Sequence, residues 1–467
     1  MKSSKPPLYA PYWQGILLSF KEQITTIFRR PTTTAPWSKR RVSAQLWRTA
    51  RKAPLVLSFL TTAFGLQGYA HGASESERQM SEITIEFDRQ ILPLIEKWKV
   101  PGMSLAVAKD GKLIFAKGYG FSDVDKSIPV SASTLFRMGS INKTLTAAAV
   151  MKLVEQGKLS LDEPVLPILG RVGVLPNDIT DPRAHSITIR QLLQHTGGFD
   201  RDASGDPFFQ PRLVGIARRQ RISPVTCDAI VRDTLSFPMD FAPGSRFSYS
   251  NLGYCMLGII VRAAAGESYQ TFVNRELLNP SIGKPYVAGE SMRSMPNEST
   301  YYMPPGSARM KAAPGLDGMW GVPAPYGSYS IENMEALGAW VTTPLDMLKF
   351  FLALDGSRGS ALLSADSIRQ MREPPPHASL QKQPPFRYYG LGLSVLQTPR
   401  GPNWWHDGSQ PGLTTLALRT AEGYAWVFAI NTRPQEANLS QFFTDFDQAM
   451  WKAARSVRTW PERDLIE

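Results

Sequence analysis

The sequence lacks the short motifs that mark several common enzyme chemistries. Its 467 residues contain no Gly-x-Ser-x-Gly elbow, no His-Glu-x-x-His zinc helix and no glycine-rich phosphate-binding loop. They also contain no repeat period and no low-complexity tract. These absences argue against the chemistries that such motifs carry. The composition, 43% hydrophobic and 20% charged, is typical of a globular protein with a large core.

Cysteine is scarce, since only Cys227 and Cys255 occur. Two cysteines are compatible with an exported protein that does not depend on disulfides. Cys255 lies in an apolar run, so we expect a buried thiol there rather than a bridge.

Acidic residues are nearly missing from the N-terminal segment. Residues 1–52 contain eleven Lys and Arg against one Glu, a net charge of +10, and the whole chain carries +12. The other 415 residues therefore carry only +2. A nucleic-acid-binding surface needs basic clusters within the folded part, whereas a basic leader indicates targeting. We therefore expect no nucleic-acid partner.

An uncharged run follows the basic leader at residues 53–66 and precedes small residues at 68–73. The run is short for a membrane span, and this order is typical of a signal peptide. We interpret residues 1–73 as a leader and signal peptide cleaved near residues 70–73, and we expect a periplasmic or secreted protein. Three alternatives stay open: a misplaced start codon, an uncleaved membrane anchor at residues 53–70, and an acid-poor organellar presequence.

The strongest chemical signal is Gly139-Ser140-Ile141-Asn142-Lys143, which we place at the first turn of a helix that stops at Gly157. Residues three apart share a helix face, so the Ser140 hydroxyl and the Lys143 amine can reach each other. Serine needs a base to act as a nucleophile, and a desolvated neutral lysine can serve. Lowering a lysine pKa from about 10.4 to near 7 costs about 4 kcal/mol, so we expect burial and a second assisting group. The alternative is an N-cap serine beside a solvated lysine.

Ser-x-x-Lys occurs three times, so context must decide which copy matters. Ser281 and Lys284 are flanked by two prolines and a glycine, and Ser379 and Lys382 lie between two proline clusters. Neither serine opens a helix in such surroundings. We therefore favour Ser140.

A second signal is Tyr249-Ser250-Asn251, on a loop that leads into an apolar helix over residues 252–265. A tyrosine near a protonated lysine has its phenolate favoured, so Tyr249 can exchange protons with Ser140 and with a leaving group. Asn251 can donate to a substrate carbonyl. The alternative is a turn residue with a half-buried aromatic ring.

The third signal is His406-Asp407-Gly408-Ser409, on a segment that resembles a strand. His195-Thr196-Gly197 has the same form, but it closes a predicted helix over residues 189–194 and precedes Tyr249 in sequence, so we favour His406. Gly408 lets backbone approach a substrate closely, and the Ser409 amide can point at a developing oxyanion.

Hydrophobic periodicity predicts an α+β fold of two parts, an antiparallel sheet flanked by helices and an all-helical insertion that carries Ser140. We place the folded domain at residues 82–460 and the insertion at roughly 140–390. The expected elements are a helix over residues 83–98, a hairpin from 103–108 and 113–117, a hairpin from 413–419 and 424–430, and a helix over 439–455.

Together these features resemble the penicillin-recognising serine hydrolases, the class C β-lactamase family with its DD-peptidase, D-aminopeptidase and esterase branches. The three signals follow that family's order of Ser-x-x-Lys, Tyr-x-Asn, and Lys- or His-x-Gly over residues 83–451. Accessory stretches at residues 159–164 and 192–198 also agree. The resemblance implies a cleft between a sheet domain and a helical domain, with no metal or cofactor. It implies catalytic roles for Ser140, Lys143 and Tyr249, and substrate binding by Asn251, His406, Gly408 and Ser409.

His406 departs from the Lys-Thr-Gly usual in class C β-lactamases, where the lysine attracts a substrate carboxylate. A histidine is at most a partial cation near neutral pH. We therefore expect an ester, amide or D-peptide substrate, peptidoglycan fragments included, more than efficient β-lactam hydrolysis. The alternative is a catalytically weak penicillin-binding or peptidoglycan-sensing protein.

The proline- and aromatic-rich stretch at residues 296–329, with Trp320, Tyr326 and Tyr329, is a candidate wall of the substrate pocket. A packed surface loop is the equal alternative.

Overall fold

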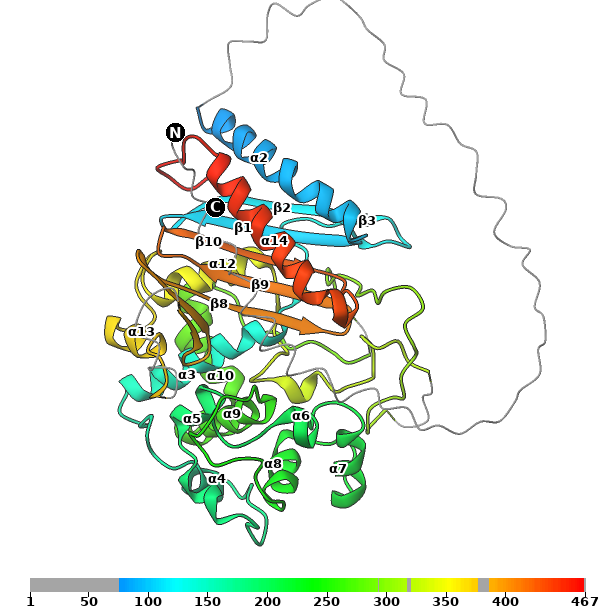
Figure 1. The fold of residues 1–467 in the computed structure, drawn as a ribbon, viewed down its shortest axis with the longest axis vertical. Helices are drawn as coiled ribbons and strands as arrows, with labels where there is room; N and C mark the ends of the chain where they lie inside the picture. The colour runs from blue at the N-terminus through cyan, green and yellow to red at the C-terminus, as the bar shows by residue number, and fades with distance from the viewer. Residues whose placement is uncertain (1–74, 293, 317–320, 377–385, 466–467) are drawn as a thin grey trace, which may run out of the picture.

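The computed structural model describes residues 75–465 apart from 293, 317–320 and 377–385 (Figure 1). The predicted leader, Trp320, and the pair Ser379 and Lys382 lie outside the described residues. Within the described part of the chain, no helix is both long enough and apolar enough to cross a membrane.

An eight-stranded antiparallel sheet forms the centre of the fold, in the order β3-β2-β1-β10-β9-β8-β7-β6. β1 (Gly102–Lys109) pairs with β10 (Tyr424–Ile430), so strands from the two ends of the described chain meet in one sheet (Figure 1). The other strands are β2 (Lys112–Asp123), β3 (Ile128–Pro129), β6 (Phe386–Tyr389), β7 (Ser394–Thr398), β8 (Gly401–Gln410) and β9 (Leu413–Arg419), with β4 (Phe136–Arg137) and β5 (Val341–Thr342) in a separate two-stranded sheet.

Two long helices, α2 (Glu75–Lys97) and α14 (Glu436–Ser456), lie side by side across one face of the sheet (Figure 1). Each helix buries one apolar stripe against the strands. Phe87 of α2 stacks on Phe115 of β2 with ring centroids 5.1 Å apart, and Phe446 of α14 packs 5.6 Å from Phe428 of β10. These contacts fix both terminal helices to the sheet.

The other face of the sheet carries a helical layer built around α3 (Asn142–Glu155) and α9 (Asn251–Ala265). Residues 144–151 of α3 are all buried, so the helix that follows Ser140 is surrounded by protein. The other helices are α4 (Leu166–Arg171), α5 (Ile189–Leu193), α6 (Arg201–Ser204), α7 (Arg212–Gln220), α8 (Cys227–Leu235), α10 (Tyr269–Val273), α11 (Asn279–Ile282), α12 (Pro344–Leu354) and α13 (Ala365–Met371), with short turns η1 (Gly139–Ile141), η2 (Pro182–Ser186), η3 (Asn274–Leu278) and η4 (Glu332–Met334).

The predicted fold class is confirmed, and most predicted elements are present. The second hairpin has the predicted bounds, and the first hairpin and the C-terminal helix extend beyond theirs. The N-terminal helix begins earlier than predicted and ends one residue sooner, at Lys97. Around Ser140 the chain forms the tight 3₁₀ turn η1 rather than the first turn of an α-helix, and α3 begins at Asn142. Helix α3 ends at Glu155, and Gly157 adopts a positive φ of 68°, which accounts for the predicted stop.

The expectation of a buried free thiol at Cys255 is wrong, because Cys255 forms a disulfide with Cys227. Cys227 begins α8 and Cys255 lies in the second turn of α9, and these helices pack together with the two Cα atoms 6.0 Å apart. The apolar run around Cys255 shows burial correctly but says nothing about a partner 28 residues away.

Reduction of this disulfide should lower the free energy of unfolding by roughly 3 kcal/mol, because the cross-link restricts the unfolded chain over the intervening segment. The measurement is the urea midpoint of unfolding, with and without a reductant. A variant with Cys227→Ala and Cys255→Ala is the control and should not respond to the reductant. Equal midpoints for the oxidised and reduced natural chain would contradict the expected contribution.

Candidate active site

Ser140 lies in the turn η1, where the helical layer meets the edge of strand β8. A Cβ atom added to Gly408 would lie 2.5 Å from the Met138 carbonyl oxygen and 3.1 Å from the Ser140 amide nitrogen. Such distances leave no room for a side chain at Gly408. Thr415 of β9 also donates to the Met138 carbonyl at 2.9 Å. The sheet therefore holds the Ser140 turn through direct backbone contact at Gly408, and the predicted close approach of a substrate to this glycine stays a prediction.

Lys143 is fully buried one turn after Ser140. Its Nζ atom lies 3.1 Å from Ser140 Oγ, 2.8 Å from Asn251 Oδ1 and 3.0 Å from the Leu337 carbonyl oxygen. Burial lowers the pKa of Lys143 well below its ordinary value, against the opposing charge of Asp206. The predicted burial and assisting groups are therefore present, and burial favours the neutral amine that a general base requires.

A neutral amine has two hydrogens and one lone pair, and this count fixes the direction of the hydrogen bond to Ser140. The Leu337 carbonyl and Asn251 Oδ1 can only accept, so they take both hydrogens of Lys143. In the neutral form the lone pair is left for Ser140, whose hydroxyl then donates to Lys143 Nζ, whereas the ammonium form donates to all three oxygens. The neutral form gives the arrangement that general-base activation of a serine requires.

Tyr249 lies on the other side of the Lys143 amine, with Nζ 4.9 Å from its ring centroid. Burial raises the pKa of the Tyr249 phenol, against smaller opposing effects of a hydrogen bond to Ser140 and the Arg201 charge. The raised pKa runs against the expectation of a favoured phenolate, because desolvation outweighs the nearby positive charge of Arg201. Tyr249 remains a phenol beside Ser140, suited to donating and relaying a proton.

Asn251 begins α9 and uses both ends of its side-chain amide. Its Oδ1 accepts from Lys143, and its Nδ2 donates to Asp206 Oδ2 at 2.6 Å. Among the described residues only Asp206 is recorded as accepting from Nδ2, so the second N–H of this amide remains suited to a substrate carbonyl, as predicted.

His406 lies in β8 with its ring bonded on both sides. Nδ1 lies 2.7 Å from the Asp407 carbonyl oxygen, which can only accept, so Nδ1 carries the proton. Nε2, 2.9 Å from the Tyr389 hydroxyl, is then the acceptor. Burial lowers the pKa of His406 to about 3, so the ring is neutral. The expected lack of a permanent cation is thus supported, but the ring nitrogens serve bonds within the protein.

Ser409 completes the predicted set at the edge of β8. Pairing with β7 runs from Gly401 to Trp405, whereas pairing with β9 continues to Gln410. A Cβ atom added to Gly139 would lie 3.5 Å from the Ser409 amide nitrogen. The backbone amides of Ser140 and Ser409 therefore both lie at the contact between Gly139 and Gly408. Ser409 Oγ accepts from Arg433 Nε at 2.6 Å.

His195, which the sequence suggested only as a helix end, is also part of the site. Its ring centroid lies 4.3 Å from that of Tyr249 and 4.6 Å from that of Tyr389, and its Nδ1 accepts from the Ser250 amide at 3.1 Å. Its positive φ of 57° fits a helix end as well. The accessory stretch at residues 192–198 was the signal that could have identified it.

Arg201, Asp206 and Arg433 are charged residues that motif reading missed. The guanidinium carbon of Arg201 lies 4.7 Å from the Tyr249 ring centroid, and Arg433 forms an ion pair with Glu436. They stand in loops or helix starts far from the motifs in sequence, and their spacing carried no signal.

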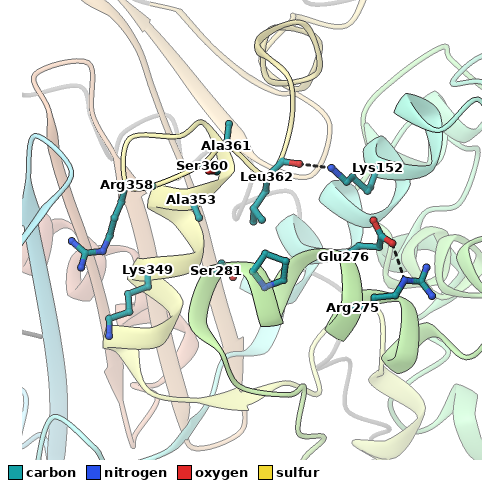
Figure 2. Close-up of a pocket in the computed structure, with 12 residues that line it drawn as sticks. Lys152, Arg275, Glu276, Ser281, Lys349, Ala353, Arg358, Ser360, Ala361 and Leu362 are labelled. Carbon is teal, nitrogen blue, oxygen red and sulfur yellow. Dashed lines mark hydrogen bonds and ion pairs between the residues drawn. The ribbon is translucent and has the colours of Figure 1, made fainter.

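In the second Ser-x-x-Lys motif, the side chains of Ser281 and Lys284 bond to other groups in the protein. Ser281 Oγ donates to the Leu277 carbonyl at 2.6 Å, and Lys284 forms an ion pair with Asp346 at 2.8 Å. Figure 2 shows Ser281 in a cavity of about 470 Å³, where Lys152 donates to the Leu362 carbonyl. Because Lys152 lies nine residues after Lys143 along α3, this cavity is remote from Ser140.

The stretch at residues 296–329 is tied to the strand that leads into Ser140. Arg137 of β4 is buried, pairs with Glu298 at 3.2 Å and donates to the Pro325 carbonyl at 2.9 Å. Tyr326 accepts from the Tyr301 amide at 2.9 Å, and Tyr329 lies within 3.3 Å of Arg137 Nη1. Packing therefore accounts for both tyrosines, and a role as a pocket wall stays a prediction.

Comparison with known proteins identifies the family and the fold of the chain. A family model described as Beta-lactamase matches residues 87–446. Among curated proteins, protein flp of Staphylococcus aureus (strain N315) is 29% identical over 280 residues, which is 59% of this chain and 51% of that protein. A probable fimbrial assembly protein FimD, serogroup H1, of Dichelobacter nodosus is 31% identical over 216 residues, 46% of this chain and 50% of that protein. The chain spans about half the length of these relatives.

Three solved structures show the same fold. They are a penicillin-binding protein homologue from Pyrococcus abyssi, described as octameric (TM-score 0.58, 24% identity, 79% of this chain and 77% of that one), D-amino acid amidase from Ochrobactrum anthropi SV3 (0.61, 22%, 82% and 100%), and EstCE1, described as a hydrolase with promiscuous acyltransferase activity (0.62, 21%, 80% and 99%). At these identities the likeness concerns the fold alone.

The site geometry predicts how two substitutions affect acylation. Lys143→Ala and Tyr249→Phe should each lower the rate of acylation by at least about 100-fold, because general acid–base catalysis is typically worth 10²- to 10⁴-fold. The measurement is the pre-steady-state rate of acylation by an ester, with circular dichroism as the control for folding. A Tyr249→Phe variant with near-normal rates on every substrate would make Tyr249 a structural residue.

Proposed function

The chain belongs to the beta-lactamase family, and from that premise we propose that it is a serine hydrolase that forms an acyl-enzyme on Ser140. The observation that carries the proposal is the 3.1 Å approach of the buried Lys143 amine to Ser140 Oγ. The two acceptors on Lys143 leave its lone pair for the serine hydroxyl. A structural lysine would instead be expected to pair with a carboxylate, as Lys284 does with Asp346.

The proposed acylation moves one proton in a circuit. Lys143 takes the proton of Ser140 while Oγ attacks the substrate carbonyl, and the amides of Ser140 and Ser409 stabilise the oxyanion. The ammonium of Lys143 then returns the proton through the Tyr249 hydroxyl to the leaving alcohol or amine. Water cleaves the acyl-enzyme by the reverse circuit, which releases the acid and restores the Ser140 hydroxyl.

The proposed substrates are uncharged esters and amides, D-amino-acid amides and peptides included. The neutral His406 offers no cation to a substrate carboxylate, and the guanidinium of Arg433, which donates to Ser409, is paired with Glu436. The names of two structural neighbours, a D-amino acid amidase and a hydrolase with promiscuous acyltransferase activity, agree with this class. β-Lactams are the weaker candidates.

We also propose that the protein is exported. Disulfides such as the one between Cys227 and Cys255 form and persist in oxidising compartments such as the periplasm. The composition of residues 1–73 also resembles a basic leader with a signal peptide.

The acylation site can be tested by covalent labelling of the unmutated protein. Mass spectrometry after treatment with a fluorophosphonate should place the adduct on Ser140, because its hydroxyl lies beside a neutral amine. Ser140→Ala is the matched control and should remain unlabelled. An adduct on Ser281, or no adduct with any acylating probe, would refute the proposal, and a β-lactam adduct without ester turnover would favour a penicillin-binding sensor.

The substrate class can be tested through His406. Short p-nitrophenyl esters and D-amino-acid amides should have higher kcat/KM than nitrocefin. His406→Lys should shift the ratio toward nitrocefin, because the nitrocefin carboxylate favours the charged form of a lysine beside it. The measurement is steady-state kinetics on both substrate types, with thermal unfolding as the control for the buried lysine. Nitrocefin turnover above ester turnover in the unmutated protein would contradict the proposed class and make Arg433 the candidate carboxylate partner.

A further inference from the structure

Asp206 joins the site from the loop after α6. Its Oδ2 accepts from Asn251 Nδ2 at 2.6 Å, and its Oδ1 accepts from the Phe208 amide at 3.1 Å. The Phe209 amide donates to the Asp206 carbonyl at 3.2 Å, so the same short turn holds both backbone and carboxylate. The carboxylate thus has a fixed direction, toward an asparagine 45 residues away in sequence.

The two ends of an asparagine amide are nearly equal in shape, and the hydrogen-bond partners decide which end faces which neighbour. A carboxylate can only accept, so Asp206 requires the NH₂ end of Asn251. The Oδ1 end is then turned toward Lys143, as observed. In the reversed orientation Oδ1 would face the carboxylate without a hydrogen, and the NH₂ end would face Lys143.

That orientation decides where the lone pair of Lys143 points. With Oδ1 toward Lys143, Asn251 and the Leu337 carbonyl take both amine hydrogens, and the lone pair faces Ser140. With the NH₂ end toward Lys143, Asn251 would donate to the lone pair and remove the base from Ser140. On the basis of the proposed function, we propose that Asp206 is a positioning residue that fixes the Asn251 amide and so directs the Lys143 lone pair to Ser140.

Asp206 has two opposing effects on Lys143 as a base. Its position orients Asn251 in favour of the base, whereas its negative charge disfavours the neutral amine. A carboxylate nearby favours the ammonium form, so Asp206 opposes the neutral state that a base needs. Removing this charge should lower the Lys143 pKa, whereas loss of the amide orientation should lower the rate of the neutral form. The charges that act on the Lys143 pKa are those of Asp206, Arg201 and Asp407. The side chains of His195, His406, Tyr249 and Tyr254 also face Lys143, and its charge lowers the pKa of both histidines.

The test is the pH dependence of Ser140 acylation in Asp206→Asn, which keeps the shape of the side chain but lets it donate. The plateau rate should fall about 10-fold or more, with KM changed less, because a misplaced base forfeits part of the 10²- to 10⁴-fold effect of general-base catalysis. The acid limb should move to lower pH. Asp206→Glu keeps an acceptor-only group and should retain more activity than Asp206→Asn.

Asp228→Asn is the matched control. It removes the same charge from a carboxylate that pairs with Arg262 at 3.1 Å on α9, well after Asn251. This variant should acylate at the unmutated rate. A plateau in Asp206→Asn within twofold of the unmutated protein, or equal losses in Asp206→Asn and Asp206→Glu, would overturn the positioning role.

A second readout does not depend on turnover. In a ¹⁵N–¹H spectrum, assigned with Asn251→Ala, one amide proton of Asn251 should be shifted downfield by its bond to the carboxylate, and Asp206→Asn should abolish the shift. An Asn251 signal that is the same in both proteins would overturn the inference. Absence of any adduct on Ser140 in the unmutated protein would instead refute the proposed function, while the spectrum still tests the orientation.

Discussion

The site depends on keeping the Lys143 amine out of water. Full burial removes the hydration that an ammonium requires, and this desolvation is the largest influence on its pKa. The effect extends to the neighbours. Burial also raises the pKa of the Tyr249 phenol, against the opposing charge of Arg201. One constraint thus favours a neutral base and a neutral acid side by side.

Acceptor-only groups supply the direction that burial cannot. Three groups in the site can only accept hydrogen bonds: the carbonyls of Leu337 and Asp407 and the carboxylate of Asp206. Each of them fixes a neighbour that has two possible states. The Asp407 carbonyl selects the His406 tautomer, and Asp206 selects the Asn251 orientation. The acceptor-only groups therefore set the direction of the hydrogen bonds in the network, and these directions set the tautomer of His406 and the orientation of Asn251.

The sequence predicted the parts of the site whose signal is local. Ser140 and Lys143 are three residues apart, Tyr249 and Asn251 are two apart, and Gly408 follows His406 on one strand, so short-range geometry sufficed to single them out. The hairpins were predictable for the same reason, because strand alternation and turn residues are local. The structure brings these motifs together around one turn.

Other features were beyond such reading because they depend on which segments meet in space. Asp206 belongs to the site because it bonds Asn251, 45 residues away in sequence, and Cys255 is bridged to Cys227, 28 residues away. The shape of the turn at Ser140 was also missed. The backbone contact with Gly408 accompanies a 3₁₀ turn where helix propensity suggested α. Long-range contact, with no counterpart in spacing, decides each of these features.

The buried lysine also lowers the stability of the folded state, and proton linkage gives the pH dependence of this loss. With its folded-state pKa depressed, Lys143 is neutral in the folded protein at pH values where the unfolded chain still binds the proton. Stability therefore rises with pH through the window between the depressed value and the ordinary value near 10.4, at up to about 1.4 kcal/mol per pH unit. The penalty is complete below this window and falls as the pH rises through it. The disulfide lies where it can offset that penalty, since Cys255 is four residues after Asn251 on the same helix and ties α9 to α8. The helix that presents Asn251 to Lys143 is thus cross-linked close to the point where the site is most costly to assemble.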